Sequence, residues 1–86
     1  MKDTLLYILT QIVDHPDAVI VEETNEDSRI ILHVRAHQED YGKIIGKSGR
    51  IIKALRDLIK LIATKQNQYV DIVLDEDEQP AQEAQV

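Results

Sequence analysis

Apolar residues near the start of the chain recur with the spacing of an amphipathic helix. Positions i, i+3, i+4 and i+7 place side chains on one helical face. The residues at that spacing are Leu5, Ile8, Leu9 and Ile12. Pro16 disfavours helical backbone at the residue before it. The pattern therefore predicts a helix over residues 3–14.

Two short segments that follow have the composition of strands. Residues 18–24 (AVIVEET) are rich in β-branched side chains, and residues 29–36 (RIILHVRA) alternate between apolar and polar positions. Between them, residues 25–28 (NEDS) are typical turn formers. The pattern predicts an antiparallel hairpin with a four-residue turn.

The second half of the chain predicts two helices and a last strand. A short helix over about 38–45 ends at Gly46, a longer one covers 50–64, and residues 69–74 (YVDIVL) form the strand. One broad apolar stripe of the longer helix consists of Ile51, Ile52, Leu55, Leu58, Ile59 and Ile62.

The order of these elements is α-β-β-α-α-β. A helical crossover between the last two strands suits a parallel pair. We therefore expect one α+β domain over residues 1–74, with helices on one face of a three-stranded mixed sheet. Residues 75–86 are acidic and contain almost no large apolar side chain, which predicts a disordered tail.

Charge is unevenly distributed along the chain. The formal net charge is −6 over 86 residues, yet the segment 43–65 contains seven basic residues and only one acid, Asp57. Acids more than about 10 Å away are largely screened at ~0.1 M salt. The acidic total therefore does not exclude an anionic partner for this segment.

Several other classes of protein are not expected. There is no cysteine, and no apolar run approaches the ~20 residues of a membrane helix, so we expect a cytoplasmic protein without a membrane partner. His33 and His37 lie on or just after a strand, where spacing i, i+4 does not converge, so no metal site is expected. No carboxylates accompany a nucleophile or base, so no catalytic residues are predicted and the protein is expected not to be an enzyme.

The segment GKIIGKSGRII, residues 42–52, carries the most specific signal. A P-loop needs four residues between its first glycine and Gly-Lys-Ser, and here there are three. Two glycines around Lys47 and Ser48 instead let the backbone turn and approach a ligand. The free N–H groups of the following helix favour an anion. The residues expected to bind a phosphodiester backbone are Gly46, Lys47, Ser48, Gly49 and Arg50, with Lys43 and Lys53 as further cations.

Residues 44–55 resemble the KH-domain signature I-I-G-x-x-G-x-x-I-x-x-[IL], with every fixed position filled. The element order is similar to the type II KH arrangement, whose β-α-α-β core would cover about 29–74. Length, first helix and the DHPD segment at 14–17 look like the small bacterial single-KH proteins of the KhpA type.

This resemblance implies non-enzymatic binding of about four nucleotides of single-stranded RNA. Residues 29–36 would form the second wall of the groove. The aliphatic residues expected to contact bases are Ile44, Ile45 and Ile52. Proteins of this type are described as RNA chaperones that pair with a larger KH protein and influence cell division and cell shape.

An alternative hypothesis is that the chain is a protein-assembly module whose KH surface mainly binds a partner protein. Leu61 lies outside the apolar stripe of the longer helix. With Ala54 and Asp57, at spacing i, i+3 and i+7, it would form a homodimer or heterodimer contact, although a single exposed leucine is also ordinary.

Overall fold

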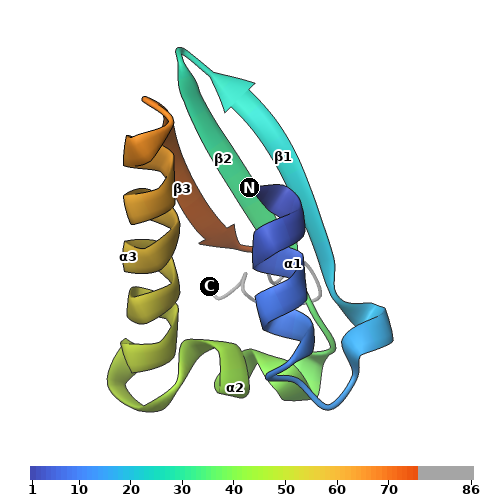
Figure 1. The fold of residues 1–86 in the computed structure, drawn as a ribbon. Coiled ribbons are helices and arrows are strands. Elements are labelled where there is room, and N and C mark those ends of the chain that lie inside the picture. The colour runs from blue at the N-terminus through green and yellow to red at the C-terminus, as the bar shows by residue number, and fades with distance from the viewer. Residues whose placement is uncertain (76–86) are drawn as a thin grey trace, which may run out of the picture.

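The computed structural model describes residues 1–75. Its element order confirms the predicted α-β-β-α-α-β arrangement (Figure 1). The helices and strands are α1 (Lys2–Thr10), β1 (Ile20–Glu26), β2 (Arg29–Arg35), α2 (Tyr41–Ile45), α3 (Arg50–Lys65) and β3 (Tyr69–Leu74). Short 3-10 turns occupy Pro16–Ala18, Gln38–Asp40 and Lys47–Gly49. Of the expected acidic tail, only Asp75 lies within the described residues.

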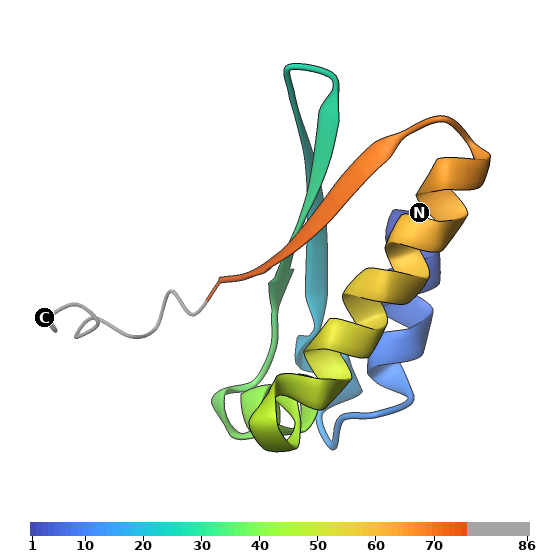
Figure 2. The same cartoon turned by 90° about the vertical axis from the view of Figure 1, so that its left-hand side faces the viewer.

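The sheet has the order β1-β2-β3, with β2 in the centre. β1 pairs with β2 antiparallel, and β2 pairs with β3 parallel. The chain between the parallel strands crosses over through α2 and α3, as a parallel connection requires. Both long helices lie on the same side of the sheet (Figure 2). The domain is therefore a two-layer α+β fold, as expected.

The core fills the space between the helices and this face of the sheet. The side chains buried to 1% exposure or less come from every layer of the fold. They include Leu5, Leu9, Leu32, Val34, Ile44, Ile59, Ala63 and Val70. Because α1 and α3 share one face of a small sheet (Figure 2), each presents only a narrow line of side chains to it.

Three predicted boundaries were wrong. α1 ends at Thr10, because the N–H groups of Gln11 and Ile12 bond three residues back and tighten the chain. Ala18 belongs to a 3-10 turn and not to a strand. The hairpin turn is only Asp27–Ser28, with φ of 48° and 69°. Two positive φ values fit a turn whose twist matches that of the strands, so pairing extends to Glu26.

The predicted apolar stripe of α3 is also only partly buried. The line of α3 that faces the sheet consists of Ile52, Leu55, Ile59 and Ala63. Ile51 is 36% exposed and Leu58 is 42% exposed, because the helix covers only one sheet and nothing packs on its flank in residues 1–75. Together with two exposed neighbours they form what we call the α3 apolar strip: Ile51, Ala54, Leu58 and Leu61.

A buried carboxylate ties the first connection to the start of α2. The Asp40 side chain is fully buried and accepts hydrogen bonds from the Asp14 N–H (3.2 Å), the His15 N–H (2.9 Å) and His15 Nδ1 (3.1 Å). Burial alone would raise the pKa of Asp40, but these bonds and the nearby His15 outweigh it and lower the pKa below its ordinary value. His15 therefore links the connection after α1 to the start of α2.

Candidate nucleic-acid interface

The backbone turns sharply between α2 and α3 because Gly46 has a conformation that suits only glycine. Its φ is 78° and its ψ is 171°, and its N–H closes α2 by bonding to Gly42 O at 2.8 Å. A Cβ atom on Gly46 would lie 2.6 Å from Ile51 Cγ1. The first glycine is thus required by both dihedral angles and space.

The second half of the loop leads directly into α3. Ser48 (φ 57°) and Gly49 (φ 73°) both have left-handed backbone, and the Gly49 N–H donates to Gly46 O at 3.1 Å. α3 begins at Arg50, and no side chain of the described chain caps its first turn. The Arg50 N–H donates to Lys47 O, so the N–H groups after it are the ones that remain available to an anion, with the favourable end of the helix dipole behind them.

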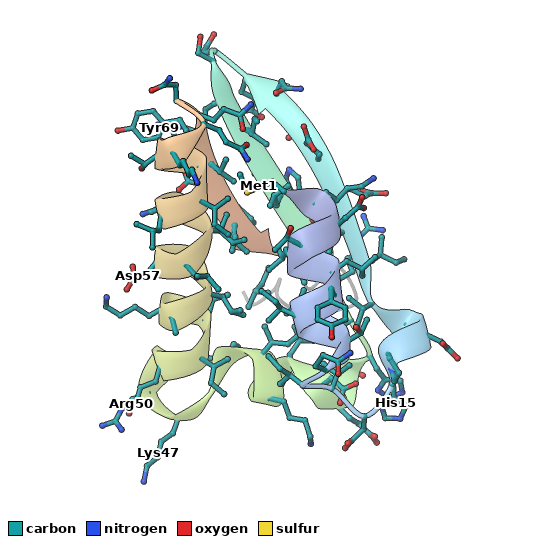
Figure 3. The ribbon with its side chains drawn as sticks, in the orientation of Figure 1. Met1, His15, Lys47, Arg50, Asp57 and Tyr69 are labelled. Atoms are coloured by element: carbon teal, nitrogen blue, oxygen red, sulfur yellow. The ribbon has the colours of Figure 1, made fainter. Side chains whose placement is uncertain are left out.

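The cations around the loop differ in how they are paired. Lys43 Nζ lies 3.2 Å from Asp14 Oδ2, and Lys53 Nζ lies 3.0 Å from Asp57 Oδ2. Within residues 1–75, Lys47 and Arg50 have no carboxylate partner. Both extend away from the body of the domain in Figure 3. Lys47 and Arg50 therefore give the loop its uncompensated positive charge.

The aliphatic residues of the signature divide between core and surface. Ile44 is fully buried and Ile52 is 7% exposed, so both pack in the core. Only Ile45 is partly exposed beside the loop. A base contact by Ile44 or Ile52 would require repacking of the core, so Ile45 is the most accessible of the three predicted contacts.

The strand beside α3 is β3 and not β2, contrary to the expected second wall at 29–36. β2 is the central strand and is paired on both sides. The Asp75 N–H bonds to Val34 O, so the backbone groups of Asp75 point toward β2. Along a strand the N–H and C=O groups of successive residues point to alternate sides, so those of Ile72, three residues earlier, point away from β2. Arg56 Nε and Nη2 both donate to Ile72 O at 3.3 Å. The open edge of β3 thus forms the wall that faces α3.

Sequence reasoning did not single out Arg56, although it counted this residue among the seven basic ones. Its partner is a backbone carbonyl 16 positions away, and a backbone partner leaves no signal in the sequence. Lys53, Arg56 and Lys60 follow one another at helical spacing, so they share one face of α3. We call these three residues the α3 basic row.

The predicted dimer residues lie on a different side of α3. Leu61 is 69% exposed, and Asp57 pairs with Lys53. At 100° per residue, Leu58 at the centre of the α3 apolar strip lies about 160° around the helix from Arg56. The centres of the α3 basic row and of the α3 apolar strip therefore face different directions.

One group of potential metal ligands comes together in the described chain. Donor atoms of His15, His37 and Glu39 lie within 4.8 Å of one another. The two imidazole rings are stacked, however, with centroids 3.9 Å apart and planes inclined by 12°. A metal ion lies in the plane of each ligating ring, and two nearly parallel rings share no such point. In this arrangement the two histidines do not coordinate one ion together.

Comparison with known proteins agrees with this geometry. The sequence model of the family described as "KhpA/KhpB, KH domain" matches residues 2–74. The chain belongs to this family. Relatives include proteins named RNA-binding protein KhpA from Oceanobacillus iheyensis (37% identity; 85% of this chain, 100% of the relative), Clostridium acetobutylicum (47%; 81% and 93%) and Chlamydia caviae (42%; 90% and 99%).

Among solved structures, the crystal structure of Aquifex aeolicus Era bound to GDP and aluminium fluoride is similar to the KH fold seen here. The TM-score is 0.46 at 18% identity, and the match covers 92% of this chain but only 32% of Era. Every helix within residues 1–75 is too short or too polar to cross a lipid bilayer.

Proposed function

We propose that this KH domain binds single-stranded RNA through its phosphate backbone, without catalysis. One observation supports this most directly: the N–H groups that follow Arg50 at the start of α3 have no side-chain cap, and the two exposed cations beside them, Lys47 and Arg50, lack carboxylate partners in the described chain. The relatives are named RNA-binding proteins. A phosphodiester supplies the anionic oxygen that such a helix start favours.

The remaining contacts follow from the surrounding surface. Bases of a strand held at the loop lie toward Ile45, the α3 basic row and the open edge of β3, where Ile72 O already accepts hydrogen bonds. Aromatic platforms are few, since the chain has three tyrosines and neither Phe nor Trp. We therefore propose weak, sequence-tolerant binding, as an RNA chaperone acting in the cytoplasm requires.

The test is the affinity of the full chain for a short single-stranded RNA, measured by fluorescence anisotropy. Lys47→Asp reverses a charge at the loop, and Lys2→Asp makes the same change at an exposed position of α1. We expect Lys47→Asp to weaken binding about tenfold or more, as for loss of a charge-assisted contact. Lys2→Asp should leave binding nearly unchanged. An equal loss of RNA affinity in both variants would refute the proposal that the glycine loop binds the phosphate backbone.

Salt dependence gives a second measure. Two or three neutralised phosphates predict a log–log slope of affinity against salt of about −1.5 to −2, at roughly −0.7 per phosphate. A slope near zero would show that the protein does not bind the phosphates of the RNA.

A second proposed function is assembly with a copy of itself or with a larger KH protein through the α3 apolar strip. Its support is a continuous exposed line in which Leu61 is 69% and Leu58 is 42% exposed. An exposed apolar line of this kind is typical of a helix that packs on a partner.

A further inference from the structure

A recess of about 490 Å³ opens at the end of α3 that is opposite the glycine loop. Tyr69 beside it and Lys47 at the loop lie at opposite ends of α3 in Figure 3. The floor is apolar, formed by Ala63 and Val70, each 1% exposed. The recess is of the size that small ligands occupy in proteins, about 300–1,000 Å³.

The rim of the recess has the chemistry of a base-binding site. Asn67 and Gln68 supply side-chain amides, which offer both donors and acceptors to the edge of a base. The Tyr69 side chain is 71% exposed, and an exposed aromatic ring is a stacking surface. Arg29 lies over this ring, with its guanidinium carbon 5.9 Å from the centroid, and pairs with Asp71 at 3.4 Å.

The lining of the recess is mostly uncharged, which suits a base. Lys60 is the only cation among the residues that line it. Lys60 also ends the α3 basic row, which begins near the glycine loop with Lys53. The row therefore connects the loop to the recess along one side of α3.

The length of α3, which separates the glycine loop from the recess, exceeds that of four stacked nucleotides. α3 has 16 residues and is about 24 Å long. Stacked nucleotides are spaced by about 3.4 Å, so about seven of them cover this length, and fewer do so when the strand is extended. The glycine loop of a KH domain holds about four.

We propose that this recess is a second nucleotide subsite, which takes an unpaired base of the same RNA strand that the glycine loop holds. This inference rests on the proposed function. It predicts that RNA longer than about four nucleotides gains affinity through stacking on Tyr69 and contact with the Asn67 and Gln68 amides.

The experiment compares oligouridylates of four and eight nucleotides by fluorescence anisotropy, with the full chain and its variants. Tyr69→Ala should weaken binding of the eight-nucleotide RNA about fivefold or more, which corresponds to about 1 kcal/mol. The same variant should leave the four-nucleotide RNA unchanged. Tyr69→Phe keeps the ring and should bind both RNAs like the original chain.

Tyr7→Ala is the matched control, because Tyr7 is 66% exposed on α1. Circular dichroism of each variant checks that it is folded. The subsite is refuted if Tyr69→Ala affects both RNAs equally or neither. Lys47→Asp should weaken both RNAs, so the proposed function stands or fails independently of the subsite.

Discussion

The side chain of Ile51 fills the space beside Gly46, where a Cβ atom would lie 2.6 Å from Ile51 Cγ1. At Gly49, by contrast, a Cβ atom would meet nothing within 4 Å. The two glycines of one short motif are therefore constrained differently, the first by space and backbone angles and the second by its φ of 73° alone.

Alanine at each glycine should separate these two constraints. Gly49→Ala should lower the free energy of unfolding by about 1–2 kcal/mol, the cost of left-handed backbone. Gly46→Ala should cost about 3 kcal/mol or more, since a glycine-only conformation and an overpacked contact add to one another. Urea denaturation measures both, and equal losses would contradict the steric argument. For the same reason, RNA-binding tests are better made at Lys47 than at Gly46.

Removing the Tyr41 hydroxyl should destabilise the junction of α2 with the sheet. The hydroxyl accepts from the Ala36 N–H (3.2 Å) and donates to Asp75 O (2.6 Å), and the residue is 6% exposed. Tyr41→Phe leaves these partly buried backbone groups without their partner, at a cost of about 1–3 kcal/mol in unfolding free energy. Tyr7→Phe, at an exposed position, should change it by less than about 0.5 kcal/mol. If both variants changed the free energy of unfolding by a similarly small amount, the two hydrogen bonds of the Tyr41 hydroxyl would contribute little to stability.

The stability of the domain should fall in acid because of Asp40. Its folded-state pKa is lowered, since hydrogen bonds from residues 14 and 15 outweigh the opposing effect of burial. The contribution is therefore fully present above the unfolded pKa of about 3.9 and is lost as the pH falls through the folded value. The urea midpoint of the original chain should drop over this interval. The Asp40→Asn variant should be less stable at pH 7, and its urea midpoint should fall less as the pH is lowered. An equally steep fall in the variant would refute the role given to Asp40.

Leu61→Asp should weaken self-association and leave the fold intact. A charge on the α3 apolar strip costs about 1 kcal/mol or more at an interface, whereas an exposed substitution changes unfolding free energy by less than about 0.5 kcal/mol. Sedimentation measures the mass, and Thr4→Asp on α1 adds the same charge at another exposed site. An unchanged mass for Leu61→Asp, or a monomeric original chain, would rule out self-association through this strip.

Arg56→Gln should show whether the link between α3 and β3 matters for RNA. The side chain of Arg56 donates twice to Ile72 O. Glutamine removes the charge and shortens the reach, so we expect about threefold to tenfold weaker RNA binding, typical of one lost cation contact. Arg56→Lys keeps the charge and should retain most of the affinity. Equal losses of RNA affinity in both variants would show that the two hydrogen bonds to Ile72 O matter for the structure and that the charge of Arg56 does not matter for RNA binding.

The order of the elements, the glycine loop and the family could all be predicted from the sequence, because these depend on local patterns. Helical spacing, strand alternation and the φ preference of Gly46 and Gly49 are all properties of neighbouring residues. The folded chain was needed to show which side of α3 is buried, that β3 lies beside it, and that His15 contacts Asp40. Those outcomes depend on how a small sheet shares one face between two helices, and contacts between distant segments leave no periodic signal in the chain.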